Sequence, residues 1–227
     1  MRPPIEFLLP PELGIELLYS FVIVICSLMI YRATREMYEL SSYKGIQYFR
    51  RAFLFFAIAY FFRYSIKYLI FFFNLQEIIE LNPHAIGNLS LFIFLYSSFM
   101  AMFYLLYSVM WKKWSHTPIK VLLINSAALL LAFLGVISHS QEMSIFLNAA
   151  LLVAISFVFS KAYHESHNKE KGKGLYFIYF LLVLFWILNI IDILLPRFLH
   201  IYQIGIYLVS TFLFMAILYK VLKRSGN

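Results

Sequence analysis

The sequence predicts an all-α, polytopic membrane protein built from seven transmembrane helices. Apolar residues make up 63% of the 227 residues and charged residues only 13%, which is more apolar surface than a soluble domain of this length can bury. Stretches of the ~20 apolar residues that cross a bilayer recur along the chain. Lys and Arg fall almost wholly in every second gap between them. The expected spans lie near residues 15–34, 52–73, 86–110, 119–138, 143–163, 175–195 and 200–219.

The charge distribution predicts the orientation. Fifteen of the 19 Lys and Arg residues fall in four segments, at 32–51, 112–120, 161–173 and 220–224, whereas most acidic residues occupy the other gaps. The positive-inside rule then places the N-terminus outside and the C-terminus in the cytoplasm of a cell-membrane protein. We therefore assign the net charge of +8 to orientation and to anionic lipid rather than to nucleic acid. The bases expected at the lipid surface are Arg50, Arg51, Lys112, Lys113, Lys171, Lys173, Lys223 and Arg224.

The connections between the spans are short. Residues 41–44 link the first two spans and residues 139–142 link the fourth and fifth. Short connections make neighbouring helices antiparallel, and none of them is long enough to hold a soluble domain. We expect residues 1–227 to form a single membrane domain.

Two fixed offsets indicate an internal repeat. At an offset of 129, Arg32, Glu36 and Gly45 align with Lys161, Glu165 and Gly174. At an offset of 113, Leu95 and Met102 align with Leu208 and Met215, and the hydroxyl residues Ser97 and Ser98 align with Ser210 and Thr211. The sequence thus predicts that residues 15–110 and 143–219 are parallel three-helix units joined by a linker helix at 119–138, and related by rotation about the membrane normal. The alternative is chance similarity between apolar helices.

Span 2 contains an unusual pair of charges. Arg63 lies about midway along this span and Lys67 lies one turn further out, while Asp192 in span 6 is the only acid inside another span apart from Glu16, at the outer edge of the first span. Charges at such depth cost a few kcal/mol each unless they are paired or hydrated. The offset of 129 aligns Arg63 with Asp192, so we expect them to meet near the midplane, with Asn189 one turn away.

Two interpretations of this cluster stay open. In the first, Arg63 and Asp192 form a structural ion pair while Lys67 extends to the outer interface. In the second, the three groups line a cavity, where their total charge of +1 favours an anionic or zwitterionic small molecule. Proton coupling through Asp192 is a further alternative. Ser97, Ser98, Ser210 and Thr211 would line the same axis, or simply let the helices approach closely.

Other site chemistry is weakly indicated. His84, His139 and His200 all lie at outer span ends, where three imidazoles would suit zinc or copper, but no metal-binding spacing connects them. Span 7 has its lysine, Lys220, at its end rather than its middle, so a retinal Schiff base is not expected, and no other cofactor motif is present. The sequence shows no pattern that would pair a nucleophile with a general base, and we do not expect an enzyme.

Two classes of function remain. The repeat and the charge cluster favour a small-solute carrier or facilitator, because carriers bind their substrates between such repeats. The alternative is a seven-helix sensor or receptor that signals through a separate partner, for which the outward N-terminus and the basic cytoplasmic side are typical. The sequence does not predict the ligand or the oligomeric state.

Overall fold

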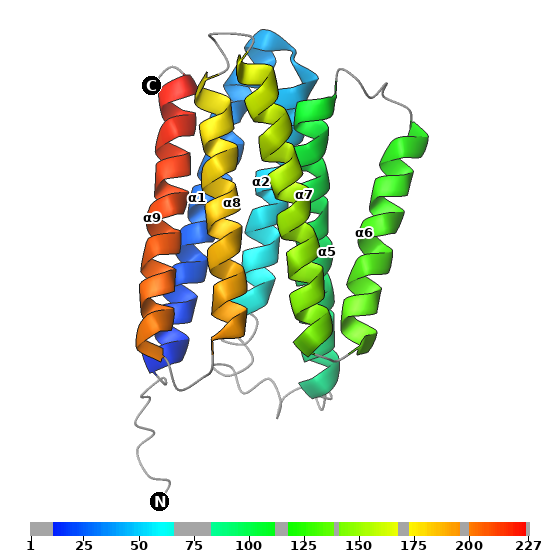
Figure 1. Ribbon diagram of the computed structural model, residues 1–227, viewed down its shortest axis with the longest axis vertical. Helices are drawn as coiled ribbons and strands as arrows, with labels where there is room; N and C mark the ends of the chain where they lie inside the picture. The colour runs from blue at the N-terminus through cyan, green and yellow to red at the C-terminus, as the bar shows by residue number, and fades with distance from the viewer. Residues whose placement is uncertain are drawn as a thin grey trace, which may run out of the picture.

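A computed structural model describes residues 11–65, 83–111, 118–138, 141–167, 173–195 and 200–225. Within these ranges the chain is helical apart from the connection at 42–43 and the helix ends at 111 and 195, with seven α-helices and one π-helical turn that run roughly side by side (Figure 1). Labelled as in Figure 1, the elements are α1 (Pro11–Ser41), α2 (Lys44–Tyr60), η1 (Phe61–Ser65), α5 (Pro83–Met110), α6 (Pro118–Ser138), α7 (Gln141–His167), α8 (Lys173–Leu194) and α9 (His200–Ser225).

Five of the described helices are long and apolar enough to cross a membrane. These segments are Gly14–Ser41, Gly87–Met110, Lys120–Ser138, Ile145–His164 and Tyr202–Ser225. The apolar part of α8, Tyr176–Asp192, is shorter. The architecture is that of a multi-pass helical membrane protein, while seven crossings and their orientation stay predictions.

The first two helices extend beyond their predicted spans. α1 continues past position 34 to Ser41, and α2 begins at Lys44 rather than at 52. Hydropathy marks the part of a helix that lies in lipid, and both helices continue past it into polar sequence. Ser42 ends α1 with a φ of 51°, a left-handed conformation that closes the last turn through a Ser42 N–H to Tyr38 O bond of 2.8 Å.

Six helices form a closed ring in the order α1, α2, α5, α7, α8, α9, and α9 packs back against α1. α6 lies outside this ring against α5 and α7, and Figure 1 shows it at the edge of the bundle. Gly135 of α6 permits this approach. A Cβ at Gly135 would lie 2.5 Å from Leu95 Cδ1 and 2.9 Å from Leu147 Cδ1, so a larger residue would require the ends of these two leucine side chains to shift.

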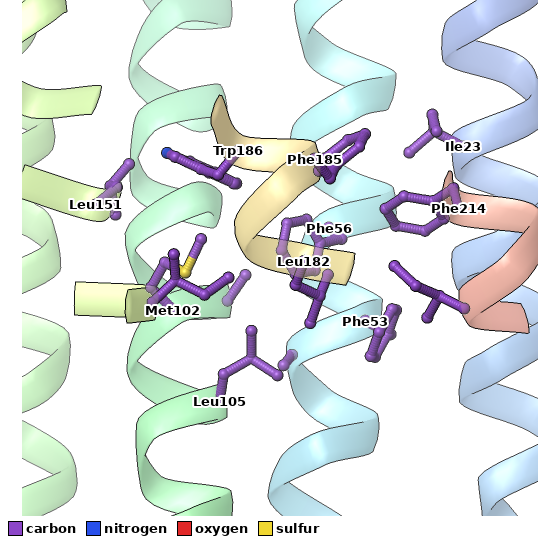
Figure 2. Close-up of a cluster of buried hydrophobic side chains, with 14 of the residues drawn as sticks. Ile23, Phe53, Phe56, Met102, Leu105, Leu151, Leu182, Phe185, Trp186 and Phe214 are labelled. Atoms are coloured by element: carbon purple, nitrogen blue, oxygen red, sulfur yellow. The ribbon is translucent and has the colours of Figure 1, made fainter. Parts of the chain in front are cut away.

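Large side chains from α2, α8 and α9 fill the centre of the ring (Figure 2). Phe53, Phe56, Phe185 and Phe214 are fully buried, and Trp186 is nearly so. The Phe185 and Phe214 ring centroids lie 4.9 Å apart with planes at 65°, a favourable edge-to-face contact. Lipid offers little hydrophobic drive for helix association, so this close packing is what holds the ring together.

The bundle has two chemically different ends. One is the end at which α1 and α9 finish (Figure 1), and there Arg32, Arg51, Lys223 and Arg224 are exposed. We call it the basic end, and the opposite one, where α1 begins, the N-terminal end. Arg50 also lies at the basic end, but its Nε donates to Tyr31 O at 3.1 Å and its guanidinium lies 4.5 Å from the Tyr31 ring centroid.

Candidate functional site

The candidate site begins with an irregular turn, the π-helical η1, which contains Arg63. Two serines from neighbouring helices donate to one carbonyl just before this turn and one within it. Ser20 Oγ of α1 lies 2.7 Å from Tyr60 O, and Ser90 Oγ of α5 lies 2.5 Å from Phe62 O. Hydroxyl side chains of this kind satisfy the carbonyls that an irregular turn frees inside a membrane protein. The π-turn is therefore supported from both sides.

The π-turn also determines where Arg63 points. One extra residue in a turn rotates every later side chain by about 100° around the helix. Such single-turn insertions recur at functional sites. Here the turn directs the Arg63 side chain across the bundle toward α8, where it meets Asn189 and Asp192.

Four side chains form one polar network, which we call the Arg63 network: Tyr60, Arg63, Asn189 and Asp192. Tyr60 Oη donates to Asn189 Oδ1 at 2.7 Å, and Arg63 Nη1 donates to the same oxygen at 2.9 Å. Arg63 Nη2 lies 3.3 Å from Asp192 Oδ2. Asn189 Nδ2 donates to Phe185 O at 2.9 Å, so the amide oxygen is held facing α2. The predicted contacts of Arg63 with both α8 residues are present.

The Asp192 carboxylate is only partly satisfied. Its side chain is 8% exposed, against 17% for Arg63, and its second oxygen, Oδ1, is buried with no hydrogen-bond partner in the described part of the chain. A buried acceptor without a partner costs about 1–3 kcal/mol. The geometry leaves one strong acceptor position open beside an arginine.

Aromatic rings surround the network. The Arg63 guanidinium lies 5.3 Å from the Phe94 ring centroid of α5. Tyr19 of α1 stacks on Tyr207 of α9 at 4.8 Å and meets the edge of Tyr60 at 5.9 Å. The Tyr207 hydroxyl also lies close enough to the Asp192 carboxylate to interact with it as a hydrogen-bond donor, although Oδ1 has no hydrogen-bond partner among the described residues. The charged pair is therefore enclosed by side chains from α1, α2, α5, α8 and α9.

The network lies toward the N-terminal end of the described helices. Asp192 is close to Leu194, the last residue of α8, and Tyr207 lies in the first third of α9. α2 begins at Lys44, and residues 66–82, which follow η1, lie outside the described structure. The depth of Arg63 in the membrane therefore stays a prediction.

Comparison with known proteins gives one full-length relationship. The chain is 35% identical over 228 residues to an uncharacterized protein of Archaeoglobus fulgidus, and the match covers 98% of this chain and 95% of that protein. The chain belongs to this archaeal protein's family. Because the match spans nearly all of both chains, the family shares the whole bundle rather than one three-helix unit. No family model and no solved structure matches the chain.

The other predicted site residues do not join the Arg63 network. Ser97 and Ser98 are buried one turn beyond Phe94, and Ser210 is buried one turn beyond Tyr207. Thr211 Oγ1 donates within its own helix to Tyr207 O at 2.8 Å. All four hydroxyl residues therefore lie toward the basic end of the network without a bond to it.

The predicted cation and metal ligands fall mostly outside the described structure. Lys67 and His139 lie beyond the described residues, as do the side chains of His84 and His200. Among the residues that the structure describes, no group of three or more His, Cys, Asp or Glu residues is placed to hold a metal ion.

Sequence reasoning missed the tyrosines and the two serines. Tyr60 carries a signal that could have been used, because it aligns with Asn189 at the same offset of 129 that aligns Arg63 with Asp192. Tyr19, Tyr207, Ser20 and Ser90 carry none, since tyrosine and serine are common in membrane helices. Only the folded arrangement brings them to the site.

Proposed function

We propose that the protein is a membrane carrier or facilitator for a small anionic or zwitterionic solute that binds at the Arg63 network. One observation carries this proposal. Tyr60 bonds to Asn189 and Arg63 bonds to Asp192, and each pair is separated by the repeat offset of 129 residues. Symmetry-equivalent residues that touch each other must lie at the symmetry axis. The network would therefore lie at the interface between two repeats, where carriers bind their substrates.

The burial pattern of α2 and α8 supports the repeat. Six residues that are buried on α2 have counterparts 129 positions later that are buried on α8: Phe49 and Ile178, Ala52 and Leu181, Phe53 and Leu182, Phe56 and Phe185, Ala57 and Trp186, Tyr60 and Asn189. Chance similarity of two apolar helices would match composition, but it would not reproduce the same buried face. The pattern favours equivalent positions for α2 and α8 in the fold.

The order of the helices also supports the repeat. A half-turn of the ring exchanges α1, α2 and α5 with α7, α8 and α9, and every packed neighbour pair is then replaced by another packed pair. On α9 the buried residues Ser210, Phe214 and Val221 fall 113 positions after Ser97, Ala101 and Ser108, which are buried on α5. α6 has no equivalent helix under this half-turn, as expected for a linker helix.

Transport fits these features better than a purely structural role. A structural ion pair needs no π-turn, whereas η1 places Arg63 and is itself supported by Ser20 and Ser90. The aromatic packing of Phe53, Phe56, Phe185 and Phe214 fills the ring toward the basic end. We therefore propose that this conformation is closed at the basic end, and that rocking of the two units about the network would open it. We propose no catalytic step.

Reconstitution tests this proposal. Purified protein in liposomes would be given a mixture of small anionic and zwitterionic metabolites, and the trapped solutes would be identified by mass spectrometry. A carrier accumulates at least one of them, and Arg63→Gln abolishes this uptake. Arg35→Gln is the matched control, because Arg35 also pairs with an acid, Glu39 at 2.7 Å, but is exposed. A ligand that binds without crossing the bilayer would instead favour the sensor or receptor.

A further inference from the structure

We propose that the Arg63 network selects a zwitterion with a carboxylate and a protonated amine close together, as in an α-amino acid, over a simple anion. This inference rests on the proposed function. Its basis is that the described site presents one guanidinium and one carboxylate, of which the carboxylate has a buried oxygen without a partner.

The first argument is charge balance. Within the Arg63 network as described, the charges of Arg63 and Asp192 cancel, and both side chains are largely buried. A monoanion would bring an unbalanced charge into a region of low dielectric, which is costly. A zwitterion brings no net charge. Its carboxylate can lie next to the Arg63 guanidinium and its ammonium group next to the Asp192 carboxylate.

The second argument is the open acceptor on Asp192. Oδ1 is buried, has no hydrogen-bond partner among the described residues, and belongs to a side chain that is more than nine-tenths buried. An ammonium group offers three donors and no acceptor. It therefore satisfies a carboxylate oxygen that an anionic ligand would leave unsatisfied or repel.

The third argument is that the ion pair can open without displacing Arg63. The Arg63 Nη2–Asp192 Oδ2 distance is 3.3 Å, longer than the 2.7–2.9 Å typical of charge-assisted bonds. Asn189 Oδ1 and the Phe94 ring hold the guanidinium independently of Asp192. A ligand carboxylate can thus replace Asp192 at Nη2 while the ammonium binds the released carboxylate.

The tyrosines complete the cationic half of the site. Tyr207 interacts with Asp192 and stacks on Tyr19, which contacts Tyr60. Tyrosine faces attract an ammonium group through their quadrupole. The site therefore provides a cation-binding region on the Asp192 side and an anion-binding group on the Arg63 side.

A probe series with matched charges tests the inference on full-length protein in nanodiscs. The twenty common amino acids are first screened by thermal unfolding. An amino acid that stabilises is then compared with its N-acetyl derivative, an anion, and its amide, a cation. We expect one or more amino acids to raise the unfolding midpoint by about 3–5 °C at tenfold excess over Kd. Both derivatives should bind at least about tenfold more weakly, since each loses one charge–charge contact.

Variants test which residue binds each charged group of the ligand. Asp192→Asn should lose the preference for the amino acid over its N-acetyl derivative, and Arg63→Gln should lose the preference over the amide. The exposed pair provides the controls Glu39→Gln and Arg35→Gln, which should change neither preference. If the single variants do not fold, the wild-type probe series still decides, and the double variant Arg63→Gln/Asp192→Asn removes both charges together.

The outcomes separate this inference from the proposed function. An N-acetyl derivative that binds as well as its parent overturns the zwitterion, yet leaves the carrier standing if Arg63→Gln abolishes that binding. Stabilisation that depends on neither Arg63 nor Asp192, or no stabilisation by any amino acid, also overturns it. Zwitterion binding without uptake into liposomes supports the inference and overturns the carrier.

Discussion

Replacing Arg63 by Gln is expected to destabilise the protein more than replacing Asp192 by Asn. Arg63→Gln leaves the Asp192 carboxylate charged at 8% exposure and removes a donor from Asn189. Asp192→Asn leaves a guanidinium that is still 17% exposed, bonded to Asn189 at 2.9 Å and packed over Phe94. Breaking a buried pair typically costs about 3–5 kcal/mol. Because this pair is long and not fully buried, we expect about 3 kcal/mol for Arg63→Gln and about 2 kcal/mol for Asp192→Asn.

The double variant Arg63→Gln/Asp192→Asn should cost less than the sum of the single changes, because it leaves no stranded charge. We expect a coupling free energy of about 2 kcal/mol, in the range measured for interacting neighbours. Equilibrium unfolding in mixed micelles, followed by tryptophan fluorescence, measures all three free energies. The comparison is the exposed pair Arg35 and Glu39, whose bond of 2.7 Å is shorter.

The two ion pairs distinguish the effect of burial from the effect of bond length on the coupling free energy. If bond length determined the coupling, Arg35 and Glu39 would couple more strongly than Arg63 and Asp192. If burial determines it, the exposed pair shows no resolvable coupling. Additive destabilisation at Arg63 and Asp192, or a larger loss for Asp192→Asn than for Arg63→Gln, would refute the reasoning given above.

Three further predictions follow from other features. Ser20→Ala and Ser90→Ala should each cost about 1 kcal/mol of unfolding free energy by leaving a carbonyl of η1 without its donor, while an exposed serine changed to Ala should cost nothing; equal losses would contradict the role given to η1. A thiol at position 164, introduced as His164→Cys, should react with an impermeant maleimide only after cells are permeabilised, with the buried Cys26 as background; labelling of intact cells would reverse the predicted orientation. Arg51→Gln should weaken retention of anionic lipid about fivefold, and retention that ignores salt would argue against a charged lipid surface.

The sequence predicted the helices well but not their ends or irregularities. A bilayer crossing needs about 20 apolar residues, so each apolar stretch identified a helix. Polar residues such as those at 35–41 are compatible with helix and with loop, and α1 simply continues through them. The π-turn over Phe61–Ser65 has no recognisable signature, because its formation depends on hydroxyl groups that α1 and α5 supply.

Part of the candidate site could be predicted because charges are rare in membrane helices. Apart from Glu16 at the outer edge of the first span, Asp192 is the only acid in another span, and it aligns with Arg63 at the offset of 129, which was enough to pair them. The prediction that Ser97, Ser98, Ser210 and Thr211 lie on the same axis rested only on the offset of 113. An offset indicates which residues are equivalent in the two proposed units, but not how far along the bundle they lie. Ser97 and Ser210 are both buried, one turn beyond Phe94 and Tyr207 on their own helices.

The position of α6 would make two boundaries of the ring mechanically unequal if α1, α2 and α5 move as one unit against α7, α8 and α9, as proposed above. At the boundary between α5 and α7, α6 contacts both helices, with Gly135 close to Leu95 and Leu147, and it connects the two sets of helices along the chain. At the boundary between α9 and α1, no helix in the described part of the chain lies across the two, and the buried Tyr19–Tyr207 stack joins them. A rigid-body motion of the proposed units would therefore pivot about the α6 side and widen first between α1 and α9, beside the Asp192 carboxylate.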